Sequence, residues 1–213
     1  MRRFPLLIAA FSIVCLTGAG QVPQRMYQSF SAQEKAHLDR ISAYLNSIRT
    51  LRSEFVQIGP DGNADQGDLY LEKPGRIRFA FRAPNPLSIV ATGGRIYVKN
   101  ARLNTVDNHD LDDTPLGLLL NAKVDLARNR AVLGVTEQDG ALIVRARTST
   151  NRNNSNITLV FSSPVIELRQ WTVKDNQGGV TTVALQGAQT GGSLDQALFA
   201  VPAKAVKVKQ SSR

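Results

Sequence analysis

From residue 54 onward, the chain is a succession of short β-rich runs, each bounded by Gly, Pro, Asn or Asp. This spacing is typical of antiparallel strands joined by tight turns. Gly93-Gly94 and Asp139-Gly140 each separate two such runs and are strong hairpin signals. Because long antiparallel meanders usually curl or close, we expect a mainly β (α+β) fold, a barrel or half-barrel with an apolar inner face. The expected strands are 54–58, 67–72, 76–82, 87–92, 95–100, 102–107, 132–136 and 142–148, one more run before Pro164 and two after it.

The run 76–82 alternates arginines with apolar residues, which places one side in solvent and the other in the interior. Its apolar members are Ile77, Phe79 and Phe81. In the preceding strand, Leu69 and Leu71 alternate in the same way, and the alternation continues to put Lys73 on the apolar side, just before Pro74-Gly75. A lysine ammonium there needs hydrogen-bond acceptors, because an unpaired charge in an apolar site is unfavourable.

An amphipathic helix is expected over residues 32–51. Ser31 and Glu34 fit a capping box, and apolar residues then recur at steps of three and four, so that one helix face is apolar. That face contains Leu38, Ile41, Leu45 and Ile48. The helix must therefore pack against another part of the molecule.

A leucine-rich segment interrupts the strands at 113–121. Asp113 or Thr114 fits an N-cap, and Pro115 fits the first helical turn. A helix this short cannot bury its leucines alone, so we expect it to form a plug or lid at the open end of the half-barrel. Its leucines are Leu116, Leu118, Leu119 and Leu120. Further short helices are expected near 126–127 and 194–198.

Residues 1–20 have the anatomy of an export signal. Two arginines precede the apolar stretch 6–16, and small residues precede a cleavage site after Ala19 or Gly20. We therefore expect a mature chain 21–213 that forms a single domain in the periplasm.

The one cysteine, Cys15, falls inside the expected signal. Its removal leaves a mature chain without thiols, which suits an oxidising compartment. The alternative is that Cys15 remains as a lipid-attachment site. Against this, Val14 is bulky and β-branched where a lipoprotein signal has a small residue.

Composition excludes several classes of protein. A single cysteine excludes a disulfide scaffold, and no apolar run approaches the ~18 residues that span a bilayer. The 26 Lys and Arg residues exceed the 17 Asp and Glu residues, giving a net charge of +9. This charge permits contact with nucleic acid, anionic lipid or an acidic partner without choosing among them.

One stretch has the spacing of a calcium-binding loop. Asp61, Asn63, Asp65 and Glu72 match ligand positions of that loop, but Gln66 stands where its turn requires glycine. The flanking helices are also missing. We favour a polar hairpin loop.

An acidic cluster surrounds one of the two histidines. It contains Asp107, His109, Asp110, Asp112 and Asp113. A metal site would need His37 from a distant helix, so we favour a solvated loop before the lid helix and expect no metal.

The sequence contains no recognisable set of catalytic residues. The histidines are scattered, the mature chain has no cysteine, and no phosphate-binding loop or dinucleotide fingerprint is present. We expect no enzyme activity and no cofactor. Arg76, Arg78 and Arg82 on one strand face could follow phosphates and Tyr97 could stack on a base, but an exported chain rarely meets nucleic acid, and we expect none as a partner.

In order along the chain, these segments resemble the periplasmic outer-membrane lipoprotein carrier family, LolA. After the amphipathic first helix, the matching segments are Phe55-Val56-Gln57, Gly67 to Leu71, Lys73 to Phe79, Ile89 to Arg95, Thr114 to Leu120 and Phe199 to Pro202. The resemblance covers roughly residues 31–205. It implies an incomplete β-barrel whose apolar cavity is covered by an N-terminal helix and short lid helices.

The resemblance also implies which residues bind lipid. Expected cavity residues are Leu69, Leu71, Ile77, Phe79, Phe81, Ile89, Phe161 and Trp171. Expected lid residues are Leu38, Ile41, Leu45, Leu116, Leu118, Leu119 and Leu120. In the family, a basic residue at the position of Lys73, commonly arginine, holds the lid shut by bonding helix carbonyls. The resemblance therefore implies that Lys73 is a latch, although a lysine lacks the planar fork of an arginine.

The implied function is carriage of lipoproteins through the periplasm. The partners would be the acyl chains of outer-membrane lipoproteins, an inner-membrane ATP-driven exporter and an outer-membrane acceptor, and we expect the carrier to be a monomer. Two alternatives use the same fold. One is a membrane-anchored acceptor or lipid-binding lipoprotein, which Cys15 would permit. The other is an envelope sensing or structural module whose own side chains fill the cavity.

Overall fold

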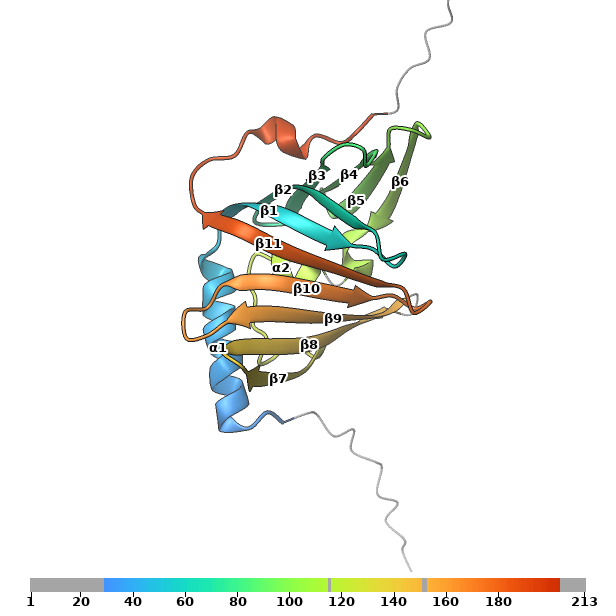
Figure 1. Ribbon diagram of the computed structural model, residues 1–213. Coiled ribbons are helices and arrows are strands. Elements are labelled where there is room, and N and C mark those ends of the chain that lie inside the picture. Colours follow the sequence, from blue (N-terminus) through green and yellow to red (C-terminus); the bar gives the residue numbers. More distant parts are fainter. Residues whose placement is uncertain (1–28, 115, 151–152, 204–213) are drawn as a thin grey trace, which may run out of the picture.

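The computed structural model describes residues 29–114, 116–150 and 153–203 (Figure 1). The expected export signal and Cys15 lie outside the described residues. Within them, the chain forms one antiparallel sheet of eleven strands with two α-helices, which confirms the predicted fold class. No helix in this part of the chain has the length and apolar character needed to cross a membrane. The strands are β1 (Thr50–Ile58), β2 (Ala64–Glu72), β3 (Arg76–Phe81), β4 (Leu87–Thr92), β5 (Arg95–Asn100), β6 (Thr105–Asp110), β7 (Val132–Gln138), β8 (Ala141–Thr150), β9 (Asn153–Ser162), β10 (Leu168–Lys174) and β11 (Val180–Thr190).

The sheet consists of two meanders joined by one long-range pairing. The strand order is β6-β5-β4-β3-β2-β1-β11-β10-β9-β8-β7, so β1 pairs with β11 and the two edges are β6 and β7. Both predicted hairpin turns are confirmed. Gly93 and Gly94 have φ of 58° and 76°, and Asp139 and Gly140 have φ of 49° and 73°, as a two-residue turn matched to the strand twist requires. Figure 1 shows the sheet curving around the side that carries both helices.

Helix α1 (Ala32–Ser47) begins with the predicted capping box and ends before the predicted residue. Ser31 Oγ accepts from the Glu34 N–H at 3.2 Å, and the Ser31 N–H donates to Glu34 Oε2 at 2.9 Å. The prediction of helix up to residue 51 is wrong at its end, because Thr50 and Leu51 belong to β1 and pair with β2. Strand pairing of Thr50 and Leu51 with β2 is thus more favourable here than a continuation of the helix, although the apolar spacing suits a helix.

The leucine-rich segment forms a shorter helix than predicted. Helix α2 (Gly117–Leu120) follows a 3₁₀ helix at Leu111–Asp113, and Pro115 lies outside the described residues. The short helix expected near 126–127 is a turn instead, because Leu126 O accepts from the Asn129 N–H at 3.3 Å. The predicted C-terminal helix is present as a 3₁₀ turn at Gln196–Phe199.

One glycine on the inner face lets two aromatic rings meet across it. Gly67 in β2 pairs with Phe55 in β1 on one side and with Phe81 in β3 on the other. The Phe55 and Phe81 rings pack edge to face with centroids 5.2 Å apart. A Cβ at Gly67 would lie 2.4 Å from the Ala80 carbonyl oxygen and 2.6 Å from the Phe55 ring. The position therefore requires a residue without a side chain.

We predict that Gly67→Ala lowers the free energy of unfolding by about 1–3 kcal/mol, because the methyl group overpacks the core. The matched control is Gly134→Ala in β7, where an added Cβ meets no atom within 4 Å. That change should leave stability unchanged or raise it by about 0.4–1 kcal/mol, since it reduces the entropy of the unfolded chain. Denaturant titration measures both variants. Equal stability of the two would contradict this account of the core.

Candidate functional site

The concave face of the sheet and the two helices enclose an apolar interior. At its centre is a small cavity. The volume that the centre of a water-sized sphere can occupy there is about 10 Å³, which is space for about one water molecule. The closed structure therefore has no room here for an acyl chain. The lining residues are Leu45, Ile48, Leu51, Leu69, Leu71, Lys73, Ile77, Leu119, Leu168, Trp171 and Leu185.

The predicted cavity residues all belong to this interior, in two groups. Those that line the central cavity are Leu69, Leu71, Ile77 and Trp171. The other four pack in the surrounding core. Phe79 and Phe161 are buried there, whereas Phe81 and Ile89 are only half-buried. Sequence reasoning did not select four of the lining residues, which are Ile48, Leu51, Leu168 and Leu185.

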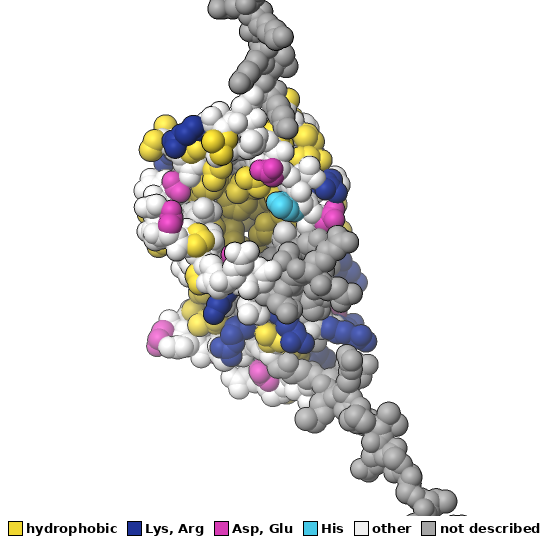
Figure 2. Space-filling view, turned by 90° about the vertical axis from the view of Figure 1, so that its right-hand side faces the viewer, with side chains coloured by type: hydrophobic (Ala, Val, Ile, Leu, Met, Phe, Trp, Pro, Cys, Tyr) yellow, Lys and Arg dark blue, Asp and Glu magenta, His cyan; other side chains and the backbone are white. Residues whose placement is uncertain are grey.

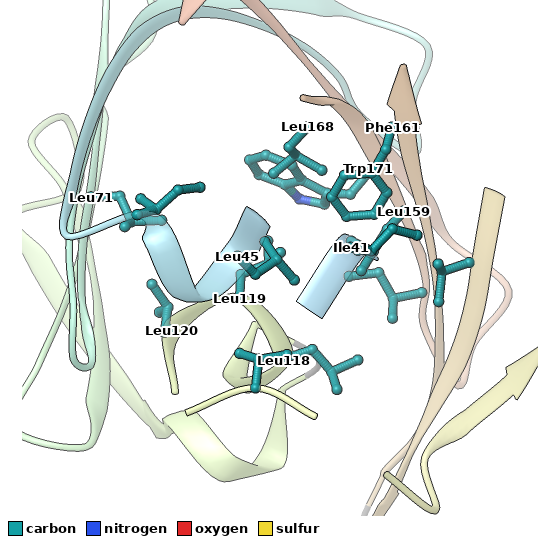
Figure 3. Packing of buried hydrophobic residues seen from close by; sticks show 14 of the residues in the cluster. Ile41, Leu45, Leu71, Leu118, Leu119, Leu120, Leu159, Phe161, Leu168 and Trp171 are labelled. Atoms are coloured by element: carbon teal, nitrogen blue, oxygen red, sulfur yellow. The ribbon is translucent and has the colours of Figure 1, made fainter. Parts of the chain in front are cut away.

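The predicted lid leucines fill the space beneath the sheet. On α1, Leu38, Ile41 and Leu45 are at most 1% exposed. The three leucines of α2 are buried, and Leu116 before them is half-buried. Figure 3 shows leucines of α2 close to Ile41 and Leu45, with Trp171 across from them on the sheet. We call α1 together with residues 116–126 the lid.

The turn between β2 and β3, residues 73–75, contacts both helices of the lid. The Lys73 ammonium donates to the Leu45 carbonyl oxygen at 2.7 Å. The backbone N–H of Lys73 donates to Arg49 O at 2.8 Å, and that of Gly75 donates to Leu120 O at 2.9 Å. Leu45 lies in the last turn of α1, where carbonyls lack partners within the helix and attract cations. The predicted position of Lys73 on the apolar side thus has the acceptor that it requires.

The electrostatics of Lys73 follow from its surroundings. Its side chain borders the leucine-lined cavity, and desolvation by burial lowers the pKa of the ammonium to about 8 from 10.5. The group is therefore mostly protonated at neutral pH but is poorly solvated when the lid is closed.

The two parts of the lid are joined by side chains that sequence reasoning missed. The Asn46 side chain accepts from the Val124 N–H and donates to the Val124 carbonyl oxygen, both at 2.8 Å. Ser42 Oγ accepts from the Leu126 N–H at 3.0 Å. The sequence does contain one hint of these bonds: Ser42 and Asn46 are four residues apart and lie beside the apolar face of α1. It does not indicate which residues they bond.

The basic face of β3 is covered and paired rather than free. Arg76 pairs with Glu72 at 2.7 Å, and its guanidinium lies 5.4 Å from the centroid of the Phe199 ring. Arg78 donates to the Leu198 carbonyl oxygen at 3.2 Å. Arg82 pairs with two carboxylates at 2.9 Å. The predicted solvent-facing arginine row is therefore largely used to hold the C-terminal 3₁₀ turn and the neighbouring strands.

Figure 2 shows a hollow with hydrophobic side chains at its bottom, on the face of the molecule turned 90° from Figure 1. On the inner sheet face, Phe81, Ile89 and Val98 pack against the core but are only half-buried. Apolar surface of the interior thus reaches solvent while the lid is closed.

The predicted alternatives for metal binding are not assembled in the described part of the chain. Asp61 and Asn63 bond to each other in the β1–β2 turn, while Glu72 lies at the far end of β2. His37 lies 3.7 Å from Glu137 on edge strand β7, whereas His109 lies on the opposite edge strand β6. No group of three His, Cys, Asp or Glu side chains in this part of the chain could hold a metal ion.

A curved antiparallel sheet with an apolar concave face and a helical cover defines an open half-barrel with an apolar interior. The family model described as "Outer membrane lipoprotein carrier protein LolA" matches residues 46–202. This match spans more than half of the chain. The protein belongs to the LolA family, and membership supports a lipoprotein carrier role without enzymatic activity.

Curated relatives agree with this family. The chain is similar to the outer-membrane lipoprotein carrier protein of Methylococcus capsulatus, with 26% identity over 178 residues, 79% of this chain and 85% of the relative. A relative of the same name from Chromohalobacter salexigens is 25% identical over 170 residues, 76% of this chain and 80% of its own. A solved LolA superfamily protein from Nitrosomonas europaea aligns with a TM-score of 0.39 and 10% identity, covering 76% of this chain and 97% of its own. That alignment is too distant to support further inference.

We predict that Asn46→Ala loosens the lid, because it removes both bonds to the Val124 backbone. Amide exchange at Val124 should accelerate about tenfold, which corresponds to the loss of roughly one net hydrogen bond. Ser47→Ala is the control, since the Ser47 hydroxyl donates to the Tyr44 carbonyl oxygen within α1 and, among the described residues, makes no bond to the segment around Val124. Hydrogen exchange read by mass spectrometry checks both. Unchanged Val124 exchange in Asn46→Ala would contradict the role of this side chain.

We predict that Lys73 makes stability rise with pH above about 8. Its pKa is about 8 in the folded chain and near 10.5 when unfolded, so the folded state binds fewer protons between these values. The Lys73 contribution to the free energy of unfolding therefore increases as pH rises from about 8 to about 10.5. Denaturant titrations of wild type and Lys73→Met across this range measure the difference between them. A difference that stays constant or falls with pH would refute the desolvated state of the ammonium.

Proposed function

We propose that this protein is a periplasmic carrier that moves lipoproteins from the inner to the outer membrane. The acyl chains of the cargo occupy the interior of the half-barrel after the lid has moved. An ATP-driven exporter in the inner membrane supplies the cargo, and an acceptor at the outer membrane receives it. The carrier works as a monomer. The observation that supports this proposal most is an apolar interior filled by leucines of its own lid.

Because the lid fills the interior of the empty protein, cargo binding replaces buried lid leucines with buried acyl chains. Each CH₂ group of an acyl chain gains about 0.8 kcal/mol on leaving water, and each buried leucine side chain gains about 1.5–3 kcal/mol. Opening the lid exposes leucines at a cost of several kcal/mol, and the incoming chains restore that burial. The net affinity is then modest, which suits a protein that must also release its cargo.

The hydrogen bonds that hold the lid contribute little compared with the burial of its leucines. The bonds from Lys73 to Leu45 O and from Gly75 to Leu120 O each contribute about 0.5–1.5 kcal/mol net. They fix where the closed lid sits without making opening prohibitive. Closure therefore competes with cargo instead of excluding it.

A reconstituted release assay tests the carrier function. Proteoliposomes contain the cognate exporter and a labelled lipoprotein, and receive ATP and the purified mature protein. We predict that lipoprotein appears in the soluble fraction as a one-to-one complex, only when ATP and this protein are both present.

An established carrier added to the same vesicles is the control for an active exporter. If that carrier releases lipoprotein and this protein does not, the carrier function is wrong. If this protein does not extract lipoprotein from the vesicles but takes it over from the established carrier, the anchored acceptor is favoured. Failure to bind any acyl chain would favour a sensing or structural module with a permanently filled interior.

A further inference from the structure

The Lys73 ammonium has an unusual position for a charged group. It borders a cavity whose other lining residues are Trp171 and aliphatic side chains. It has three N–H donors, and within the described residues its one hydrogen-bond acceptor is the Leu45 carbonyl oxygen at 2.7 Å. That acceptor belongs to α1 and therefore to the lid. When the lid moves away from β2, the ammonium loses the acceptor.

Neighbouring carboxylates do not offer a replacement. Glu72, next in sequence, is on the other face of β2, where it accepts from Arg76 at 2.7 Å and from Gln196 at 3.2 Å. The side chains around the ammonium on the inner face are apolar. An ammonium in such surroundings is strongly disfavoured unless it is hydrogen-bonded. An incoming ligand that displaces water from the interior can then supply the acceptor.

We propose that Lys73 is a ligand-binding residue, and that it exchanges the Leu45 carbonyl for a carbonyl of the ester or amide bond that joins an acyl chain to the cargo. This role rests on the proposed carrier function and deepens it. The same ammonium bonds the lid in the empty protein and the cargo in the loaded one. It thereby fixes the carbonyl end of a bound chain beside the β2–β3 turn.

The chemistry of acyl ligands fits this site. An acyl chain is apolar along its length and carries one strong acceptor at the carbonyl through which it is attached. The interior offers the complementary arrangement, with aliphatic walls and a single cation at one margin. Burial lowers the pKa of Lys73 to about 8, so the ammonium is protonated at neutral pH and gains from any acceptor that replaces water.

Two peptides that differ by one carbonyl test the exchange. Both have the same sequence with an acetylated N-terminus; one bears O-palmitoyl serine, an ester, and the other O-hexadecyl serine, the matching ether. Affinities for both are measured by titration calorimetry with the mature protein. We expect wild type to prefer the palmitoyl peptide about tenfold, as for a hydrogen bond to a charged donor. Because both peptides open the same lid, the ratio of their affinities cancels the cost of opening.

Three variants identify the donor. Lys73→Met should abolish the preference even if both affinities rise, and Lys73→Arg should keep it. Lys174→Met is the matched control, because Lys174 lies exposed at the end of β10, outside the lid and the cavity lining, and its loss should leave the ratio unchanged. Equal affinity of wild type for the two peptides, or a preference that survives in Lys73→Met, overturns the proposal and leaves the carrier function intact. Failure of wild type to bind either peptide overturns the carrier function itself.

Discussion

A strongly curved sheet of apolar inward side chains must be covered, and burial of that concave face governs the rest of this structure. The eleven strands bring leucines, phenylalanines and Trp171 to one side, and in the described part of the chain the two α-helices cover them. The apolar stripe of α1 and the leucines of α2 meet this need. The cover consists of helices rather than a second sheet, and in the carrier function proposed above acyl chains take the place of this cover.

The polar bonds of the lid are concentrated at a few points. The β2–β3 turn bonds the C-terminal ends of both helices through Lys73 and Gly75, while Asn46 and Ser42 bond α1 to the segment after α2. Behind the same hairpin, the C-terminal 3₁₀ turn packs against Arg76. The hairpin is thus bonded from both faces, and in the proposed carrier mechanism the lid moves while the hairpin stays with the sheet.

Alternation and turn chemistry predicted the half-barrel, its hairpins and the side on which Lys73 lies, because these depend on neighbours along the chain. The end of α1 was predicted wrongly, since Thr50 and Leu51 follow the ladder with β2 rather than their helical periodicity. The bonds of Asn46 with Val124 and the cover over Arg76 and Arg78 join residues distant in sequence, and no local pattern encodes them. The residues lining the central cavity were predicted only in part for the same reason.

Movement of the lid on binding an acyl chain is the central claim, and double electron–electron resonance measures it directly. Spin labels at Ala43 on α1 and Gln177 in the β10–β11 turn report the lid against the sheet, and labels at Gln138 and Gln177 report the sheet alone. Both pairs are introduced into residues 21–213, which contain no native cysteine. Saturating O-palmitoyl peptide should lengthen and broaden the first distance and leave the second unchanged. Saturated binding with no change in the first distance would contradict the account, because the cavity beneath the closed lid has space for about one water molecule only.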